Sequence, residues 1–335
     1  MSTTSPSPTT GDWTDLILAT ADASATWQGI FTRLRDLALA DPGPVALHRQ
    51  TVVPDRLLAE AAWNLWEDFP RCAPTVVDEL KQFWVKSASA GSAVLVLDGL
   101  SLRELPMIVG AGRGRGIESV RIEVRGSEVP TETDRFAQAL GLPGRSKLYN
   151  NQPPATFVFS GPEVYTDLFD QPFADCVSSV PSSPRIFIWH KWPDEPLIHL
   201  HEDKKDGPSI VAADTKKLLT DDAFWAFVDR LRQGRRLVIT ADHGYANSNA
   251  FSNEVKNEES VKLLRQFFGA KRCAKEDPAN PWPRRNLPPL VCRHEVWLVV
   301  MGQRKWVVQG GFPHLCHRGL SLLEAAVPFI EYPPK

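Results

Sequence analysis

Long apolar runs are missing from this 335-residue chain, and none approaches the roughly 18 residues that a membrane helix requires. A surplus of either charge is missing too. The formal net charge is −2, so any contact with nucleic acid has to come from a local patch. The N-terminal stretch MSTTSPSPTTGDW has neither a basic start nor an apolar core. We therefore expect no membrane segment and no signal peptide.

Cysteine is scarce and shows no C-x-x-C spacing. The five cysteines are Cys72, Cys176, Cys273, Cys292 and Cys316. An odd, dispersed set without a signal peptide indicates a reducing compartment, and we expect a cytoplasmic protein. The last three cysteines, taken with His294 and His317, match no zinc-finger or zinc-ribbon spacing. A structural zinc site of that kind is not expected.

Two common functional signatures are missing as well. No G-x-S-x-G is present, which disfavours an esterase with a nucleophile elbow. The segment GAGRGRG (110–116) resembles a phosphate-binding loop, but it fails G-x-G-x-x-G from each of its glycines and follows a helix-like segment. We interpret it as a surface turn.

The first quarter of the chain has the pattern of helices. Residues 1–11 form a polar tail that we expect to be flexible, and 12–88 are predicted to be helical. In ATWQGIFTRLRDLALA the apolar residues recur at helical spacing, which places Trp27, Ile30, Phe31, Leu34 and Leu37 on one face. This region carries no recognisable chemistry, so we expect it to cover the rest of the protein or to bind a partner.

From residue 92 onward the pattern changes to strands alternating with helices. SAVLVLDGL (92–100) is a continuous apolar run, typical of a strand buried on both faces of a parallel sheet. Further strands are predicted at 118–124, 156–160, 185–190, 236–241, 294–300 and 305–309, and helices at 133–141, 209–232, 257–268 and 320–326. The fold class is therefore α/β, with a mostly parallel sheet and flanking helices, and ligands are expected beyond the carboxyl ends of the strands.

Carboxylates and histidines stand where such strands end. Asp98 ends the strand at 92–97, and LVITADHGYANSN (237–249) ends another strand on Asp242 and His243. If the two strands are neighbours, three oxygen and nitrogen ligands converge on one point. Unpaired carboxylates in a partly buried position are costly, so a divalent cation is the simplest reason to gather them.

Two further segments add candidate ligands. FIWHKWPDEPLIHLHEDKKDG (187–207) follows an apolar strand and offers several residues, namely His190, Asp194, His199, His201, Asp203 and Asp206. In CHRGLSLLEAAVPFI (316–330), His317 precedes a glycine and a predicted helix. A single histidine is usually structural, but here several are expected at one sheet.

Four segments taken in order carry a family resemblance. VLVLDGLSLRELP, VPTETDRFAQALGLPG (129–144), VITADHGY (238–245) and HRGLSLLEAAVPF (317–329) resemble successive signatures of the PglZ domain, a branch of the alkaline phosphatase superfamily. The last, H-x-G-x-S-x-x-E-x-x-x-P, is close to the PglZ ending. The resemblance covers roughly 85–335 and implies a catalytic domain at 89–335 with an alkaline-phosphatase-like sheet.

The resemblance also implies two divalent metals, most readily Zn²⁺, with Mn²⁺ as a second choice. One metal is expected at Asp98, Asp242 and His243. The second is expected at His317 together with an Asp and a His from 190–206. Asp194 and His199 are our choice, although they lie five residues apart where related enzymes usually show four. A second registration, on HLHED, remains open.

Two residues are assigned catalytic roles by the same resemblance. Thr133 is the expected nucleophile, because a threonine hydroxyl needs a metal to activate it and TETDRFAQAL places it at a helix start, where an anion is favoured. Arg103 is expected to reach the phosphate. Thr131 is interpreted as a helix cap only.

We therefore predict a metal-dependent phosphoester hydrolase, most readily a phosphodiesterase acting on nucleotides or nucleic acid. The resemblance brings a context of bacterial phage defence and, as the rival hypothesis, a catalytically silent PglZ scaffold within a multi-protein complex. A sulfatase or phosphomutase is disfavoured, since no C-x-P-x-R and no obvious cap insertion are present.

Aromatic and basic residues near the motifs suggest the substrate class. The nearby cations are Arg103, Arg135 and Arg318, and the aromatics expected to stack a base are Trp189, Trp192 and Tyr245. This combination favours nucleotide diesters over monoesters. A loop-like segment at 275–290 has basic residues in or just before it, Lys271, Arg272, Lys275, Arg284 and Arg285, around Trp282. It is either solvated or a nucleic-acid contact.

Overall fold

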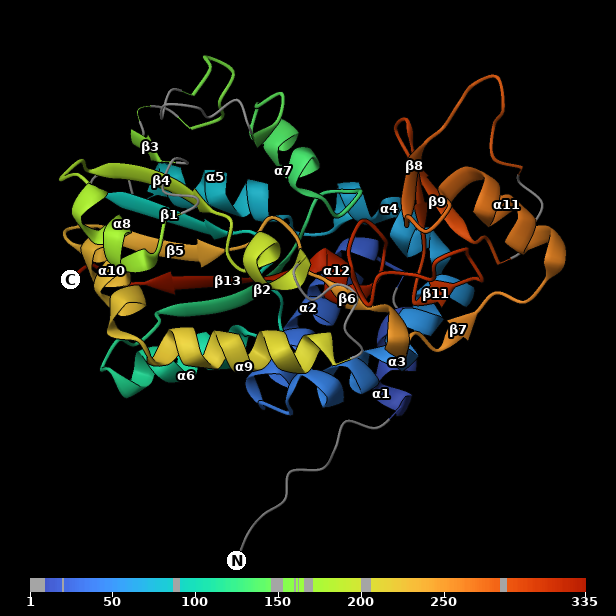
Figure 1. The fold of residues 1–335 in the computed structure, drawn as a ribbon, viewed down its shortest axis with the longest axis horizontal. Helices are drawn as coiled ribbons and strands as arrows, with labels where there is room; N and C mark the ends of the chain where they lie inside the picture. The colour runs from blue at the N-terminus through green and yellow to red at the C-terminus, as the bar shows by residue number, and fades with distance from the viewer. Residues whose placement is uncertain are drawn as a thin grey trace, which may run out of the picture.

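The computed structural model describes residues 10–19, 21–86, 91–145, 153–159, 161, 163–165, 171–199, 206–283 and 288–335. None of the helices within these ranges has both the length and the apolar character to cross a bilayer. Figure 1 shows a sheet of six strands with helices around it, and a smaller group of strands and one helix beside it.

Five helices form the N-terminal part of the chain. They are α1 (Thr10–Leu18), α2 (Ala23–Leu39), α3 (Pro44–Glu60), α4 (Trp63–Cys72) and α5 (Val76–Lys86). The apolar face expected for α2 is buried, and Trp27 packs on Trp66 and Phe69 of α4, with ring centroids 4.8 and 4.7 Å away. These helices share one continuous hydrophobic core with the sheet. They therefore cover it directly, and the proposed boundary at 88/89 stays a prediction.

The central sheet has the order β2–β13–β5–β1–β4–β3. Its strands are β1 (Ser92–Leu97), β2 (Arg121–Gly126), β3 (Glu163–Tyr165), β4 (Arg185–His190), β5 (Arg236–Thr240) and β13 (Ala326–Tyr332). β1 pairs in parallel with β4 and β5, whereas β13 runs antiparallel to both β2 and β5. The predicted α/β class with a mostly parallel sheet is confirmed. Every residue of β1 is buried, so both faces of the sheet are covered there.

The helices after the N-terminal part connect these strands. They are α6 (Leu105–Gly114), α7 (Thr133–Ala139), α8 (Phe173–Ser179), α9 (Gly207–Thr220) and α10 (Asp222–Arg232). The single helix predicted at 209–232 is two, because Asp221 is extended and its side chain caps α10 by accepting from Ala223 N at 2.9 Å. Most of GAGRGRG belongs to the last turn of α6, so the surface-turn interpretation is wrong over 110–114.

Three strand predictions differ from the structure. Residues 156–159 are not a strand. Phe157 and Phe159 are buried because they pack on Phe187, with ring centroids 5.4 and 5.8 Å from the centroid of the Phe187 ring. The run 294–300 is broken at Glu295, whose φ of +53° turns the chain between β9 (Val291–His294) and β10 (Trp297–Val300). In place of a strand at 305–309 only β11 (Arg304–Lys305) forms, paired with β7 (Asn253–Glu254).

The end of the chain departs most from expectation. The helix predicted at 320–326 is the short α12 (Leu322–Ala325), and β13 follows it at once. β13 is buried at every residue, so it has none of the alternation that marks a strand in the sequence. It also contains Pro328, which argues against a central strand, although the Pro328 carbonyl oxygen accepts from the Thr240 hydroxyl at 2.7 Å.

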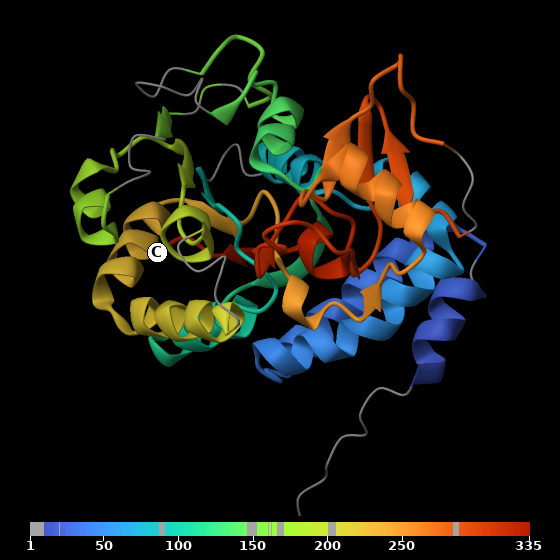
Figure 2. The same ribbon diagram turned by 45° about the vertical axis from the view of Figure 1, so that its right-hand side comes forward.

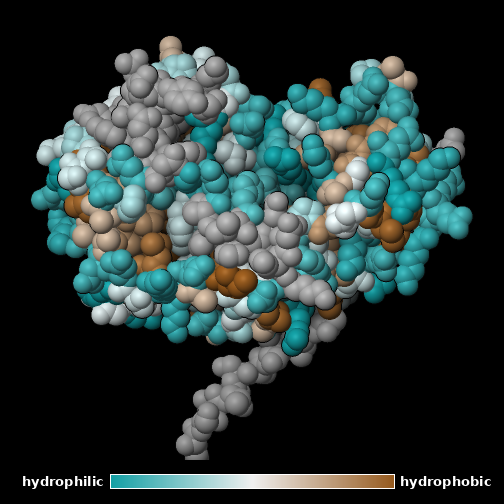
Figure 3. All heavy atoms as spheres, in the orientation of Figure 1, coloured by the Kyte–Doolittle hydropathy of each residue, from teal (hydrophilic) through white to brown (hydrophobic). Residues whose placement is uncertain are grey.

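The smaller unit consists of α11 (Glu258–Phe268) and an antiparallel sheet of β8 (Cys273–Lys275), β10 and β9. Its own apolar cluster includes Leu264, Phe268, Trp282, Leu298 and Trp306. Figure 2 shows it projecting beside the central sheet, and Figure 3 shows the outline of the molecule indented between the two parts. β6 (Ala246–Asn247) pairs with β12 (Leu315–Cys316) and ties the segment after β5 to the segment before α12.

The basic segment near β8 does not offer an aromatic face to a nucleic acid. Trp282 is buried against Phe267 and Phe268, and Arg272 is buried in an ion pair with Glu324. Arg284 and Arg285 lie outside the described residues. Stacking of a base on Trp282 is therefore excluded by its burial.

Candidate metal centre

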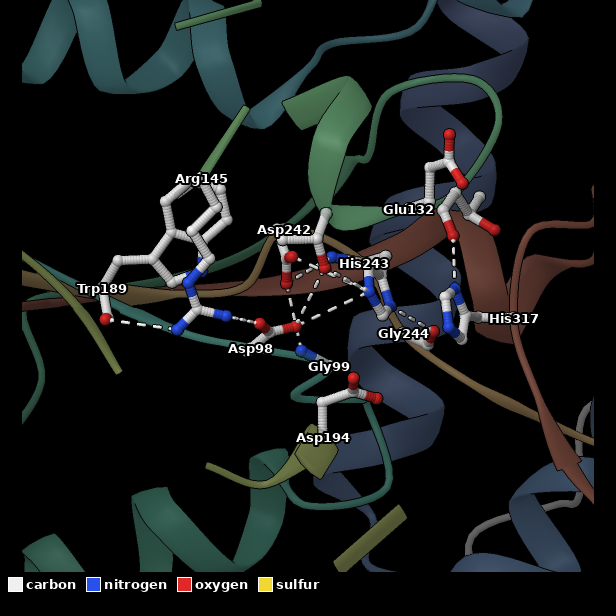
Figure 4. A network of polar contacts seen from close by, with 12 residues as sticks. Asp98, Gly99, Glu132, Arg145, Trp189, Asp194, Asp242, His243, Gly244 and His317 are labelled. Carbon is white, nitrogen blue, oxygen red and sulfur yellow. Dashed lines mark hydrogen bonds and ion pairs between the residues drawn. The ribbon is translucent and has the colours of Figure 1, made fainter. Parts of the chain in front are cut away.

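Three acidic residues meet at the carboxyl ends of adjacent strands, as Figure 4 shows. Asp98 follows β1, Asp242 follows β5, and Asp194 begins the helical turn η3 (Asp194–Ile198) after β4. The backbone ties these segments together, because Asp98 N donates to the His190 oxygen and Asp194 N donates to the Asp98 oxygen, both at 2.9 Å. All three carboxylates are buried.

The first ligand group consists of Asp98, Asp242 and His243, whose ligand atoms all lie within 4.8 Å of one another. His243 Nε2 is 3.6 Å from Asp98 Oδ1 and 3.7 Å from Asp242 Oδ2. His243 Nδ1 is 3.0 Å from the Gly244 carbonyl oxygen, a bond that requires the proton on Nδ1. Nε2 then carries no proton, and its lone pair faces the carboxylates, as in metal-ligating histidines.

Two positions next to this group, Gly99 and Gly244, require glycine. Asp242 Oδ1 accepts from Gly99 N and His243 N, both at 3.0 Å, which fixes the carboxylate. Gly99 has φ +72°, in the region that favours glycine. A Cβ on Gly244 would lie 2.3 Å from the Leu323 oxygen, so no larger residue fits behind His243.

The second ligand group consists of Asp194, His243 and His317, again within 4.8 Å. His317 Nδ1 is 3.0 Å from the Thr131 carbonyl oxygen, so its Nε2 is also left for a ligand role. The rings of His243 and His317 are stacked, with centroids 4.3 Å apart and planes 8° apart. The two ligand groups thus adjoin and share His243.

The remaining candidates from 190–206 have different surroundings. His199 Nε2 lies 3.4 Å from Asp194 Oδ2, with half of its side chain exposed, so it borders the second ligand group. His190 uses both ring nitrogens, Nε2 toward the Gln171 oxygen and Nδ1 as acceptor from Trp192 N, each at 3.1 Å, which makes it structural. His201 and Asp203 lie outside the described residues, and Asp206 is an exposed residue before α9.

Thr133, the first residue of α7, lies over the first ligand group. Its Oγ1 is 3.3 Å from Asp98 Oδ1 and 3.4 Å from His243 Nε2. Thr131 is not a helix cap, because Glu132 occupies that position. The Thr131 hydroxyl instead donates to the Gly319 oxygen at 3.1 Å and accepts from Arg318 N at 2.8 Å. It fastens the loop that carries His317.

Arg145 is a site residue that the sequence analysis missed. Its guanidinium forms an ion pair with Asp98 Oδ2, donates to the Trp189 oxygen at 3.4 Å and lies 5.0 Å from the Trp189 ring centroid (Figure 4). The available signal was its position directly after the segment 129–144. It brings a cation to the same carboxylate that Thr133 contacts.

Arg103 has a different environment from the one expected. It is buried, donates to the Tyr245 carbonyl oxygen at 2.6 Å and to Ser101 Oγ at 3.2 Å, and stands 4.6 Å from the Tyr245 ring centroid. These contacts hold the chain just after Asp242 and His243. A role of Arg103 at the phosphate stays a prediction.

The aromatics expected to stack a base are buried. Tyr245 is fully buried with its hydroxyl donating to Glu104 at 2.7 Å, and Trp189 is fully buried against Phe136. Trp192 is 6% exposed and packs on Phe173. The first two rings present no face to a substrate, so the stacking hypothesis is wrong for them. Arg135 is likewise committed, to Glu295 and to the Val129 oxygen.

The electrostatics of the site favour a bound cation. Burial, followed by the charge of Asp242, raises the pKa of Asp98 well above its usual value, and burial also raises the pKa of Asp194. Burial and the neighbouring His243 lower the pKa of His317 well below its usual value, which keeps the ring neutral. Asp194 Oδ1 and Asp242 Oδ2 are buried without a hydrogen-bond partner among the described residues. Such a donor set, carboxylates with neutral imidazoles, fits divalent metals.

A buried ion pair supports the loop that carries His317. Glu324 accepts from Arg272 at 3.0 and 3.1 Å, from Gly319 N at 2.8 Å and from Ser321 Oγ at 2.6 Å. A Cβ on Gly319 would lie 2.2 Å from Arg272 Nε. The glycine, serine and glutamate of H-x-G-x-S-x-x-E therefore act together to hold the histidine in place.

Comparisons with known proteins identify no family. No family model matches the chain, and no curated protein matches it, so the PglZ resemblance remains a prediction from the motifs. Among solved structures, an inactive variant of murine ectonucleotide pyrophosphatase/phosphodiesterase 5 in complex with AMP is similar at 13% identity and a TM-score of 0.43, covering 73% of this chain and 88% of that one. Phosphonoacetate hydrolase from Sinorhizobium meliloti 1021 in complex with phosphonoformate gives 14% identity and a TM-score of 0.44, covering 72% and 89%.

Proposed function

We propose that this chain is a metal-dependent phosphoester hydrolase with Thr133 as its nucleophile. The supporting observation is the position of Thr133 Oγ1, 3.3 Å from Asp98 Oδ1 and 3.4 Å from His243 Nε2. The Thr133 hydroxyl, which makes no other hydrogen bond within the described part of the chain, thus faces two adjoining ligand groups that share His243. A threonine hydroxyl needs this kind of setting, because at its ordinary pKa it is a weak nucleophile.

Each part of the site has a role in this proposal. Asp98, Asp242 and His243 would hold one divalent ion, and Asp194, His199 and His317 would hold a second. When bound, two such ions, Zn²⁺ or Mn²⁺, would supply positive charge that stabilises the attacking and leaving oxygens of an in-line displacement. Arg145, seated on Trp189, is placed to balance the remaining negative charge on Asp98 and on the phosphoryl group.

The reaction then follows in two steps. Thr133 Oγ1 forms a bond to phosphorus while the bond from phosphorus to the leaving oxygen breaks, and the leaving oxygen takes up a proton. Asp98 Oδ1 is the nearest acceptor for the hydroxyl proton of Thr133. Water then attacks the phosphothreonine, releases the phosphoryl product and restores the hydroxyl, so that one water is consumed per bond cleaved.

Burial of two aromatic residues bears on the predicted substrate class. Nucleotides or nucleic acid remain the predicted substrates, and phosphodiesters the predicted linkage, but burial of Tyr245 and Trp189 removes base stacking by these residues as support. The rival hypothesis is a silent scaffold in a phage-defence complex. The position of Thr133 beside two adjoining ligand groups favours the enzyme, because a scaffold needs neither the hydroxyl nor the ligands.

The test compares three threonine variants in purified protein supplied with Zn²⁺ or Mn²⁺. We expect Thr133→Ala to abolish turnover of bis-p-nitrophenyl phosphate while keeping its metal, and Thr133→Ser to retain measurable turnover. Thr32→Ala, an exposed position on α2, is the matched control and should behave as wild type. Full turnover in Thr133→Ala would show that Thr133 is not the nucleophile. A lack of turnover in wild type with both metals bound, across diesters and monoesters, would favour the scaffold.

A further inference from the structure

A small pocket of 160 Å³ opens beside the second ligand group. His199 and His317 form part of its wall, so the pocket borders the proposed reaction centre directly. Its charged lining consists of Lys271, Arg272 and Arg318, and no carboxylate lines it within the described part of the chain. The lining therefore carries positive charge, and the two acids that pair with it, Glu324 and Glu132, are not among the lining residues.

Two of the three cations are available to a ligand. Arg272 is buried and forms an ion pair with Glu324, so it stabilises the loop that carries His317 and is not free to bind a ligand in the pocket. Lys271 is exposed, just after α11, and makes no ion pair among the described residues. Arg318 has 42% of its side chain exposed; its Nε is 3.3 Å from Glu132 Oε2 without hydrogen-bond geometry. No hydrogen bond of its two terminal nitrogens falls within the described residues.

The size of the pocket indicates which chemical groups it can enclose. Pockets that enclose nucleoside-sized or drug-sized ligands usually measure about 300–1,000 Å³. A volume of 160 Å³ instead suits a group such as a phosphate or a carboxylate. Such an anion would meet an ammonium and a guanidinium, the donors that bind phosphate and carboxylate most strongly.

We propose that Lys271 and Arg318 form a subsite for a second anionic group of the substrate. The reacting phosphorus then carries, as one of its substituents, a small group that ends in phosphate or carboxylate, as in a pyrophosphate linkage. This inference rests on the proposed hydrolase site, because His199 and His317 belong to both. Thr133 contacts Asp98 and His243 and does not line the pocket, so the reacting phosphorus and the second anionic group would occupy different parts of the site.

The kinetic test compares substrates with and without the second anion. Inorganic pyrophosphate carries it, and bis-p-nitrophenyl phosphate does not. We expect Lys271→Met and Arg318→Met each to lower the ratio of kcat/KM for pyrophosphate over kcat/KM for bis-p-nitrophenyl phosphate by about tenfold, as loss of one charge-assisted hydrogen bond does. Lys262→Met, an exposed lysine on α11 that does not line the pocket, is the matched control and should keep the wild-type ratio. An unchanged ratio in both pocket variants overturns the subsite.

A binding test separates failure of the subsite from failure of the proposed function. Methylenediphosphonate, which is not hydrolysed, is titrated calorimetrically into metal-loaded Thr133→Ala protein with and without Lys271→Met or Arg318→Met. We expect Kd to rise about tenfold in each double variant. The same rise in Kd is expected even if the protein turns over no substrate. A lack of turnover would contradict the proposed hydrolase function but not the subsite.

Inorganic phosphate distinguishes a substrate group from a free anion. If the pocket receives a second substrate group, phosphate alone binds more weakly than methylenediphosphonate, and only the latter depends on Lys271 and Arg318. Equal dependence of both anions on the two residues would assign the pocket to a free phosphate and overturn the proposal. Equal metal content in all variants shows that the ligand groups are intact.

Discussion

The two ligand groups of the site share His243 but differ in how they are held. Asp98, Asp242 and His243 follow two central strands, are buried, and are fixed by backbone bonds from Gly99 and to Gly244. The second group draws on the helical turn η3 and on the loop before α12, and His199 at its edge is half exposed. The ligands of the first group thus follow strands of the central sheet directly. The second group depends on connecting segments, which are positioned by contacts with residues outside the group.

This difference predicts different behaviour. A rigid, buried group is expected to bind metal tightly. A substitution in it should release the ion but leave the fold intact, because its ligands lie just beyond the ends of the strands and not within the sheet. A group carried by loops is sensitive to the distant contacts that position it, such as the Arg272–Glu324 pair. Metal should therefore leave the second group first as a chelator is added.

The largest effect is expected at the first group. Asp242→Asn removes a ligand charge while preserving shape, so we expect loss of the metal at this group and a fall in kcat/KM of more than about a hundredfold. The metal-free variant should melt no lower than metal-free wild type, since two buried carboxylates no longer repel each other. Metal analysis, steady-state kinetics and thermal melting measure the three quantities. Full metal content in the variant would show that the group is misplaced.

The support of the second group is the next point to break. Glu324→Gln leaves Arg272 buried without its partner, and we expect unfolding to become easier by about 3–5 kcal/mol. The second metal should be lost before the first. The matched control is Glu276→Gln, whose pair with Arg293 is more exposed and should cost less than about 1 kcal/mol. Urea unfolding of both variants gives the comparison, and equal losses would contradict it.

A smaller effect is expected at His199. Because it lies at the exposed edge of the second group, His199→Asn should weaken binding of one metal by roughly ten- to a hundredfold and leave the other unchanged. His294→Asn, on β9, serves as control. Competition with a chelator of known affinity measures the metal affinity of both ligand groups. If both metals weakened equally, the two groups would not be separable as described.

The smallest effect concerns pH and the helix that braces the α12 loop. Burial raises the pKa of Asp55 on α3 to about 7, while its carboxylate accepts from Leu322 N and Gln303, both at 2.7 Å. A raised carboxyl pKa means that the folded state keeps a proton which the unfolded state loses near pH 4. Stability from this group is therefore present at low pH and lost as pH rises toward 7. Asp55→Asn should flatten the decline of unfolding free energy between pH 4.5 and 7.5, and an unchanged slope would exclude Asp55 as its source.

How far the sequence predicts this structure depends on the kind of segment. Asp98 and Asp242 were predictable because each ends a buried strand, and parallel neighbours bring such ends together. β13 was not, because a fully buried strand after a helical turn lacks periodic alternation. Arg145 was missed because nothing in its local pattern shows that it reaches Asp98, and the burial of Tyr245 and Trp189 depends on tertiary packing that a motif does not encode.

The central claim is that Thr133 attacks phosphorus, and its product can be observed directly. Wild-type protein is mixed with substrate in the presence of Zn²⁺ or Mn²⁺, quenched in acid during turnover, and digested for mass spectrometry. The account predicts the phosphoryl group of the substrate on the peptide that contains Thr133, and none in Thr133→Ala. Sustained turnover in Thr133→Ala, with no phosphorylated peptide in wild type, would contradict it.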